Sequence, residues 1–378
     1  MDVILNTESL SPPLTGIGHY TQHLLRILLD HPEIGEVRRF AGPTDVAADA
    51  AKPLVAKPLK QLLRGLPGTY PLRTWLWDQQ FRKRFGADRH AVYHEPNYIL
   101  KPYDGPCVAT VHDLSHIRFP QFHPRERVAY LERYLERTIA RADRLITLSE
   151  YMRQALIAHF SIEPARITAI HLGADERYRP RTAAETRPVL EAFGLEHGRY
   201  ILSVATIEPR KNLIRLLHAY ARLSPALRQR YPLVLAGATG WRSSAFAAEA
   251  ERLAGSNQVR LLGYVPADAL PHLYAGAALF PLVSLYEGFG LPAVEAMASG
   301  VPLLSSTLSA LPEVVGAAAL YADPENVEEI TLGIERLLKD DALRTGLVAA
   351  GLVRAAGYQW QTCVDRTVEI YRLARAAY

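Results

Sequence analysis

The sequence predicts an α/β protein in which two Rossmann-like domains, each built on a parallel sheet, face each other across a cleft. A chain of 378 residues fits two domains of about 150 to 200 residues each. Short apolar runs typical of buried strands alternate with stretches of helical length in both halves of the chain, which indicates parallel sheets with crossover helices. No repeat of about 20 to 50 residues is present, so a solenoid is not expected.

The first half begins with a strand at residues 3–5, followed by a loop and an amphipathic helix. Ile17, Tyr20, Leu24, Ile27 and Leu28 recur at helical spacing and predict that helix. Further strands are expected at 91–93, 107–111 and 144–148, with helices at 124–141 and 150–160.

The second half repeats this pattern after a segment at 179–197, whose prolines predict a connection between domains. Its strands are expected at 200–205, 233–236, 259–262, 278–281 and 302–305, with a helix at 213–223 and a last helix at 364–377. The carboxyl ends of such strands and the following helix N-termini would face a ligand in the cleft.

The composition excludes several classes of protein. Cys107 and Cys363 are the only cysteines, so neither a disulfide framework nor a cysteine-based zinc site is expected. The apolar runs are far shorter than the 18 or so residues of a membrane-spanning helix, and the first residues do not resemble a secretory signal. We therefore expect a cytoplasmic protein.

The net charge of +4 is too small to indicate nucleic-acid binding, but the charge is concentrated in one segment. Residues 52–89 hold nine basic residues against Asp78 and Asp88, with leucines and two tryptophans between them. This mixture is typical of a segment that lies on an anionic membrane surface. The alternative is an ordinary pair of solvated helices whose aromatic side chains face the core.

Two motifs of the second half suggest where a phosphorylated ligand binds. Arg210 and Lys211 stand between a predicted strand and a predicted helix, where the helix dipole disfavours cations unless an anion is bound. Glu287-Gly-Phe-Gly-Leu-Pro-Ala-Val-Glu295 joins two carboxylates through a glycine turn that a ligand could approach closely. The alternatives are that both cations are solvated, that Glu295 only interacts with the dipole of its own helix, and that Glu287 is an ordinary loop carboxylate.

Two stretches of the first half could face these motifs. Gly16-Ile-Gly18 follows the first strand, although without a third glycine it is a weak dinucleotide-binding signal. His112 and Asp113 directly follow the strand at 107–111, so the edge of the sheet would present them to the cleft. No Asp-x-Asp, no His-x-x-x-His with a catalytic Glu, no Walker A and no Gly-x-Ser-x-Gly motif is present, so we expect no metal site and no serine nucleophile.

Taken together, these stretches resemble the GT4 family of retaining glycosyltransferases. The segment from Glu287 to Glu295 is similar to that family's E-x7-E motif, and Thr206-Ile-Glu-Pro-Arg-Lys-Asn-Leu213 is similar to its phosphate-binding stretch. Further stretches resemble the family in the order it has them: Gly16-Ile-Gly18, Val111-His-Asp113, Ala142-Asp-Arg-Leu-Ile-Thr-Leu-Ser-Glu150 and Leu262-Gly-Tyr-Val265.

The resemblance implies a GT-B fold: an acceptor-binding domain at 1–185, a nucleotide-sugar-binding domain at 186–360, and a helix at 361–378 that crosses back. It implies that Glu295 holds the ribose, that Glu287 contacts the donor sugar, and that His112 contacts the sugar near the reaction centre. It assigns the remaining donor contacts to Arg210 and Lys211 for the diphosphate, Gly16 and Gly18 near the phosphates, backbone groups of Phe289, Gly290 and Leu291, and Val265 beside the base.

The implied reaction is metal-independent sugar transfer with retention, in which His112, Glu287, Arg210 and Lys211 act in catalysis and no cofactor is needed. The motifs look most like those of bacterial mannosyl- and rhamnosyltransferases of O-antigen and exopolysaccharide assembly. We therefore expect a GDP-sugar donor and a lipid-linked glycan acceptor at the inner leaflet, without nucleic acid as a partner. The alternatives are a UDP-sugar donor, a nucleotide-sugar epimerase, and a nucleotide-sugar-binding protein without turnover. The sequence does not indicate an oligomeric state.

Overall fold

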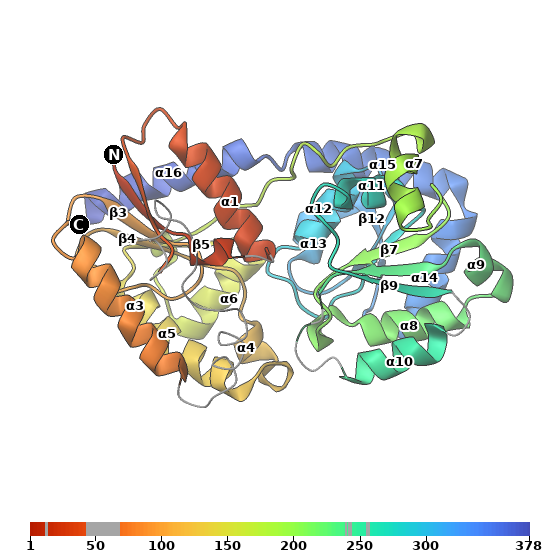
Figure 1. The fold of residues 1–378 in the computed structure, drawn as a ribbon, viewed down its shortest axis with the longest axis horizontal. Coiled ribbons are helices and arrows are strands. Elements are labelled where there is room, and N and C mark those ends of the chain that lie inside the picture. The colour runs from red at the N-terminus through yellow and green to blue at the C-terminus, as the bar shows by residue number, and fades with distance from the viewer. Residues whose placement is uncertain (12–13, 43–68, 239, 241–243, 255–257) are drawn as a thin grey trace.

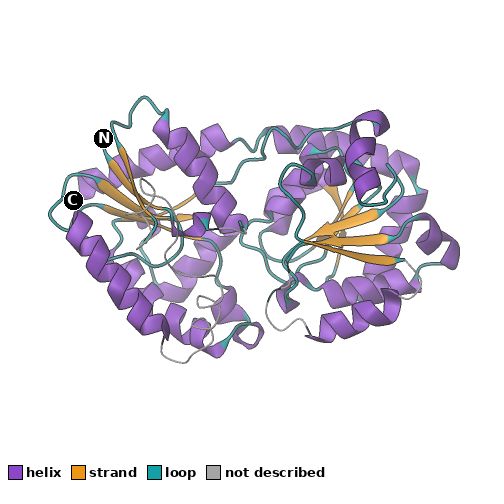
Figure 2. Ribbon diagram, viewed as in Figure 1, coloured by secondary structure: helices purple, strands orange, loops and turns teal. Residues whose placement is uncertain are grey.

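The chain folds into two α/β domains that lie side by side (Figure 1). A computed structural model describes residues 1–11, 14–42, 69–238, 240, 244–254 and 258–378. Each domain has a parallel sheet between two layers of helices, as predicted (Figure 2).

The first domain has a six-stranded parallel sheet in the order β2-β1-β3-β4-β5-β6. The order reverses between β1 and β3, because β2 pairs with β1 on one side and the chain then continues on the other. The strands are β1 (Val3–Asn6), β2 (Val37–Phe40), β3 (Val92–Glu95), β4 (Cys107–Val111), β5 (Arg144–Thr147) and β6 (Ile167–Ala169).

Alternate residues of these strands pack against opposite helix layers. Val3 and Leu5 face α1 (Gly16–Leu29) and α16 (Trp360–Ala377), whereas Ile4 packs with Phe81 and Phe85 of α3 (Thr69–Phe85). The second layer also holds α5 (Arg125–Arg141) and α6 (Glu150–Phe160). Shorter helices of this domain are η1 (Glu8–Leu10), α4 (Ser115–Arg118), η3 (Pro120–Phe122) and η4 (Pro164–Arg166).

The second domain has the Rossmann strand order. Its sheets β7-β8-β9 and β10-β11-β12 join through a parallel bridge between Ile201 and Leu279, which gives the order β9-β8-β7-β10-β11-β12. The order reverses between β7 and β10. The strands are β7 (Ile201–Val204), β8 (Leu233–Ala236), β9 (Val259–Gly263), β10 (Phe280–Leu282), β11 (Leu303–Ser306) and β12 (Ala319–Ala322).

Helices cover both faces of this sheet as well. One face packs against α8 (Leu213–Arg222), α10 (Ser244–Ala254) and α14 (Val327–Lys339), and the other against α7 (Ala183–Ala192), α11 (Leu270–Ala275), α12 (Leu291–Ala298) and α13 (Leu311–Val315). The remaining helices are η5 (Pro209–Lys211), α9 (Pro225–Arg230), η6 (Gly316–Ala318) and α15 (Asp341–Ala356).

The chain passes between the domains twice, and both passages lie close together. Gly173 of the first lies against the backbone of Trp360 in the second, so closely that a Cβ atom would be 2.1 Å from the Trp360 nitrogen. Residues 179–197, expected as a connection, contain α7, whose first turn is closed by a capping box of Thr182 and Glu185. The last helix, α16, packs on β3, β4, β5 and α1 of the first domain.

The basic segment at 52–89 lies partly outside the described residues, which include its part from 69 onward. Phe81 and Phe85 of α3 are buried, whereas Trp75 is 57% exposed and Arg82, Lys83 and Arg84 are exposed. The helix therefore places its phenylalanines in the core and its basic end at the surface, while attachment to a membrane stays a prediction. Among the described residues, no helix is long and apolar enough to cross a membrane.

Candidate active site

Several of the predicted site residues lie together where the two domains meet. In the second domain, the loops after β7 and β10 leave the sheet where its strand order reverses, which is the usual ligand position in such folds. These loops carry Arg210, Lys211 and Glu287. His112 and Asp113 follow β4 of the first domain and meet these loops from the other side.

Two cations and three carboxylates form a buried network at this point. Lys211 Nζ donates to both oxygens of Glu287, at 2.7 and 2.8 Å. Arg210 donates to Glu208 at 2.7 Å and to Glu287 at 3.3 Å, and its guanidinium lies 3.8 Å from Asp113. Figure 1 shows that β4, which leads to Asp113, belongs to the other domain.

The charges of Arg210 and Lys211 are balanced differently from what the sequence suggested. We expected Arg210 and Lys211 to need a bound anion because a helix N-terminus repels cations. The structure instead offsets their charge with carboxylates of the chain itself, and Asn212, in the left-handed conformation (φ +59°), separates them from the first turn of α8. Glu208 was not singled out in the sequence, where nothing distinguished it from a solvated loop carboxylate.

Glu287 lies at the centre of the network and is 5% exposed. Burial opposes its ionisation, but Lys211 and Arg210, together with a 2.7 Å hydrogen bond donated by Ser284, hold its pKa below the usual value. An ionised Glu287 fixes both cations in place. In this structure the Glu287 carboxylate forms ion pairs with Lys211 and Arg210. The contact with the donor sugar that the resemblance implies stays a prediction.

His112 is held as a neutral hydrogen-bond acceptor. Burial lowers its pKa, and its Nε2 lies 2.6 Å from the carbonyl oxygen of Pro96. Because a carbonyl can only accept, Nε2 carries the proton and Nδ1 is left with a lone pair. The ring stands edge-on to Tyr20, with 5.5 Å between centroids, which fixes its orientation. Such an imidazole can accept a hydrogen bond from a sugar hydroxyl.

Asp113 is ionised beside His112. Burial opposes this, but the nearby Arg210 guanidinium and hydrogen bonds from Ser115 hold the pKa of Asp113 well below its ordinary range. The sequence placed Asp113 at the cleft but gave it no role. Its role as a carboxylate partner of Arg210 depends on contact between domains, which local sequence does not reveal.

Gly16 and Gly18 differ in what surrounds them. A Cβ atom on Gly16 would meet nothing within 4 Å, whereas one on Gly18 would lie 2.8 Å from the carbonyl oxygen of Ser9. Gly18 is therefore needed for packing within its own loop, and Gly16 leaves open space at the first residue of α1. Of the two, only Gly16 offers a ligand room.

Glycine is required at two positions of the segment from Glu287 to Glu295, for a different structural reason at each. A Cβ atom on Gly288 would lie 1.8 Å from the carbonyl oxygen of His112, so this glycine lets the two domains touch. Gly290 has a φ of +97° and precedes Leu291, the first residue of α12. Ser149, which caps α6 of the first domain, donates to the Gly288 oxygen at 2.7 Å.

The side chains of Phe289 and Val265 are buried in the core, 3% and 7% exposed. The Phe289 ring packs near His171 and Tyr358, with centroids 5.8 and 5.6 Å away. A ligand would therefore reach these two positions through their backbone.

Glu295 lies on α12, apart from the network around Glu287. Burial raises its pKa to about 7, and Tyr178 and Tyr274 lie beside the carboxyl group. Tyr178 belongs to the segment that connects the domains, and its neighbours Asp175 and Arg177 also act on the Glu295 charge. The sequence did not indicate this surrounding group, because its members come from distant segments.

Glu313 of α13 was also missed. Its carboxylate accepts hydrogen bonds from the backbone nitrogens of Glu150 and Tyr151 at the start of α6, both at 2.8 Å, and lies 2.8 Å from His171 Nε2. A carboxylate of the second domain thus interacts with the N-terminus of a helix in the first. A Glu three residues into a short helix gives no sequence signal for such a contact.

Comparison with protein-family models finds a match in each domain. The model for glycosyltransferase family 4 matches residues 16–178, and the model for glycosyl transferases group 1 matches residues 191–352. The O-antigen chain mannosyltransferase B of Escherichia coli is similar over the whole length, with 37% identity over 380 residues, 99% of this chain and 100% of that protein. A serotype-specific mannosyltransferase, WbdA of E. coli, is 32% identical over 259 residues, which cover 65% of this chain and 30% of that protein.

Solved structures show the same fold at low sequence identity. Sucrose-phosphate synthase from Thermosynechococcus elongatus superposes with a TM-score of 0.76 at 20% identity and covers all of both chains. WaaG, a glycosyltransferase involved in lipopolysaccharide biosynthesis, gives a TM-score of 0.75 at 16% identity over 98% of this chain and 99% of its own. These likenesses confirm the predicted arrangement of two Rossmann-like domains.

Proposed function

Because this chain belongs to glycosyltransferase family 4 and has its GT-B fold, we propose that it transfers mannose from GDP-mannose to a lipid-linked glycan in bacterial surface polysaccharide synthesis. The observation that carries the proposal is its similarity, over the full length, to the O-antigen chain mannosyltransferase B of E. coli. Rhamnose-type donors fit the same motifs and are the nearest alternative.

The cation pair supports a role in binding and leaving-group stabilisation. Arg210 and Lys211 lie at the β7/β10 edge, where a diphosphate would meet two fixed positive charges in a site largely shielded from water. Preorganised charges of this kind stabilise the negative charge that develops on a departing diphosphate. In this proposal Glu295 holds the ribose, and His112 accepts a hydrogen bond from the donor sugar.

We propose retention without a covalent intermediate, and without a metal ion. A double displacement needs a carboxylate nucleophile beneath the anomeric carbon. The cleft carboxylates Asp113 and Glu287 are both paired with Arg210, and Glu287 also with Lys211. This supports attack on the same face as the leaving group, with the leaving phosphate as base. A trapped covalent glycosyl-enzyme would overturn this mechanism.

The exposed basic and aromatic residues of α3 support a peripheral position at the inner leaflet, where a lipid-linked acceptor would lie. Trp75 and Leu76 are 57% and 46% exposed, and Arg82, Lys83 and Arg84 follow on the same helix.

A UDP-sugar donor is the second candidate. The structure of Anabaena HepE in complex with UDP-glucose has a TM-score of 0.72 to this chain, at 16% identity. A protein that binds nucleotide sugar without turnover would make the same contacts with the nucleotide sugar. Product analysis distinguishes it from a transferase, because it would form no glycosylated product.

The test is a thermal-shift screen against GDP, UDP, GDP-mannose, GDP-rhamnose, UDP-glucose and UDP-N-acetylglucosamine in the presence of EDTA, followed by product analysis. A ligand that binds the folded state raises its stability by RT ln(1 + [L]/Kd). We expect stabilisation by the guanine nucleotides and formation of an α-mannosyl product. Stabilisation by the uracil nucleotides alone would identify UDP-sugars as the donors instead. If the chain transfers sugar from none of these donors, the proposal is contradicted.

A further inference from the structure

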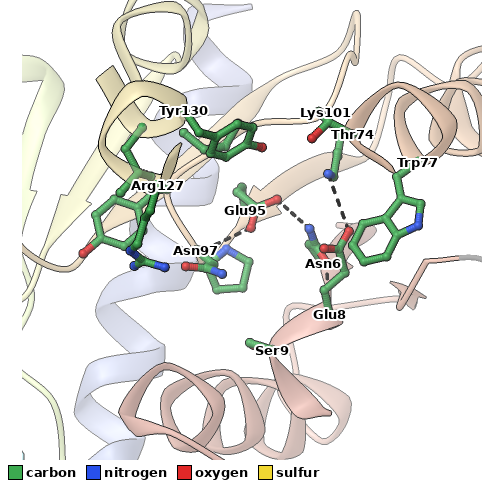
Figure 3. Close-up of a pocket in the computed structure, with 14 residues that line it drawn as sticks. Asn6, Glu8, Ser9, Thr74, Trp77, Glu95, Asn97, Lys101, Arg127 and Tyr130 are labelled. Carbon is green, nitrogen blue, oxygen red and sulfur yellow. Dashed lines mark hydrogen bonds and ion pairs between the residues drawn. The ribbon is translucent and has the colours of Figure 1, made fainter. Parts of the chain in front are cut away.

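A polar cavity of about 140 Å³ lies in the first domain, at the carboxyl ends of β1 and β3 (Figure 3). The strand order of this domain reverses between these two strands, so the cavity occupies the position that corresponds to Arg210 and Lys211 in the second domain. Its walls come from η1, α3 and α5 as well as from the strand ends. The cavity has room for several water molecules, or for one sugar ring in their place.

The cavity is floored by hydrogen-bonding groups of the two strand ends. Glu95 Oε2 accepts from Asn6 Nδ2 at 2.6 Å and from Tyr93 Oη at 2.8 Å, and Oε1 accepts from the Asn97 backbone nitrogen at 3.0 Å. Burial raises the pKa of Glu95 to about 8, so the carboxyl group is largely protonated at neutral pH. Such a group can both donate to and accept from a ligand oxygen.

The charges of the wall are largely paired with one another. Lys101 is 7% exposed, and its Nζ lies 3.6 Å from Glu8 Oε1 and 3.9 Å from Asp78 Oδ1. The same ammonium lies 5.4 Å from the ring centre of Trp77, which forms one side of the cavity. Arg127 of α5 adds a guanidinium to the lining. Paired charges, amides, a guanidinium and an aromatic ring are groups that hydrogen-bond and flank a hydroxyl-rich ligand.

Two contacts connect this cavity with the reaction centre. Pro96 lines the cavity and accepts the hydrogen bond of His112. Tyr98 lines it as well, and its hydroxyl accepts a hydrogen bond from the backbone nitrogen of Asp113, the residue that meets Arg210. A ligand in the cavity would therefore lie one residue away from the groups that border the proposed donor site.

We propose that this cavity binds a neutral hexose unit of the acceptor glycan, hydrogen-bonded by Glu95, Asn97 and Lys101 and flanked by Trp77. The proposal rests on the proposed function, because it presumes that the chain glycosylates a glycan. It adds the place where the acceptor is recognised and the chemistry of the unit recognised there.

Direct binding is tested by ¹⁵N NMR of the full chain with an α-linked mannose disaccharide, without any donor. The chain has four tryptophans, so its indole region is simple, and Trp77→Phe assigns the Trp77 signal. We expect the Trp77 signal to shift on titration, while that of Trp75, which points to solvent on the same helix, stays in place. No shift of Trp77, or equal shifts of both signals, would overturn the proposal.

Kinetics at saturating GDP-mannose give a second test. Asn97→Ala and Trp77→Phe are each expected to raise the acceptor KM about three- to tenfold, as the loss of one or two contacts predicts, with an unchanged donor KM. Gln80→Ala, an exposed amide on α3 that does not line the cavity, is the control. An unchanged acceptor KM in both cavity variants would refute the assignment.

The two experiments separate this proposal from the proposed function. If the wild-type chain transfers no mannose but the disaccharide shifts the Trp77 signal, the donor assignment fails and the cavity still binds sugar. If the chain transfers mannose and neither cavity variant changes the acceptor KM, the acceptor lies elsewhere.

Discussion

At the scale of single residues, the buried cations of this site are stabilised by individual carboxylates. Glu287 is buried with Lys211 and Arg210, and each cation would be costly without its carboxylate partners. Carboxylates of the chain itself therefore fix the positions of both cations, and a diphosphate would share them. Preorganisation of this kind makes the contribution of each cation measurable by substitution.

Lys211→Ala is expected to lower kcat/KM for the donor about 10- to 100-fold, because hydrogen bonds to charged groups are worth about 1.5–3 kcal/mol. Glu287 keeps Arg210 and Ser284 as partners in this variant, so the fold should survive. Steady-state kinetics check the prediction, with Lys339→Ala as the control, because Lys339 is exposed and pairs only with Glu335 in the part of the chain that is described. Wild-type turnover of Lys211→Ala would remove this residue from the donor site.

Glu295 makes the stability of the protein depend on pH. Its pKa is about 7 in the folded protein, above the ordinary glutamate value of about 4.3. Its contribution is therefore fully present below about pH 4 and is lost as the pH rises through 7, because ionisation is disfavoured in the folded state.

Glu295→Gln removes this ionisation and should be more stable than the wild type, by about 1–3 kcal/mol at pH 8 and by less at pH 5. Thermal unfolding across this pH range measures the difference. If the difference between the two proteins does not change with pH, Glu295 is not the titrating group.

At the scale of elements, α3 divides its residues between the core and the surface. Phe81 packs against Phe40 and Tyr93, with ring centroids 5.0 and 4.6 Å away, so the helix is anchored to the first domain. Trp75 and the basic residues from Arg82 to Arg84 stay outside. An anchored helix with an exposed basic end is suited to a membrane surface that carries negative charge.

Reversal of Arg82, Lys83 and Arg84 to Glu is expected to abolish sedimentation with vesicles that contain anionic lipid, because each basic residue near such a surface adds about 1 kcal/mol. The same charge change made at Arg252, Arg336 and Lys339, which are exposed in the second domain, is the control. Undiminished binding of the first variant would leave α3 as an ordinary solvated helix.

The strands missed by the sequence share one position in the fold. β2, β6 and β12 each lie at the edge of a sheet, are short, and are only partly buried. Arg38 and Arg39 fall within β2, where one side of the strand faces solvent and the apolar pattern is weak. The central strands, such as β4, are buried on both faces and read clearly as apolar runs.

At the scale of the whole molecule, the site exists only where the two domains meet. Ser149, Asp113 and the carbonyl of His112 from one domain contact Gly288 and Arg210 of the other. Glu313 adds a contact between domains at the N-terminus of α6. Such close approach permits a small perturbation at the interface to act on catalysis.

Gly288→Ala should separate the domains at this point, because its Cβ atom would lie 1.8 Å from the His112 oxygen. Gly288 does not have a positive φ, so alanine suits the second domain itself. We expect kcat to fall at least tenfold while GDP still raises Tm, and the radius of gyration from small-angle scattering to increase.

Gly346→Ala on α15 is the matched control, since its Cβ atom meets nothing within 4 Å, and it should be neutral or slightly stabilising. Wild-type kcat in Gly288→Ala would show that the contact between Gly288 and His112 is not needed for turnover.

The sequence by itself determined the α/β class, the two Rossmann-like halves and the residues Arg210, Lys211, Glu287, Glu295 and His112 as candidates, because strand periodicity and motif spacing are local properties. The tertiary structure alone decided which of them meet. Asp113 and Glu208 joined the cation pair, and Gly288 proved to serve domain contact. The cavity at Glu95 lay hidden as well, since its walls come from segments up to 125 residues apart. Contacts of that kind depend on how strands are ordered and how domains close, which no stretch of sequence encodes on its own.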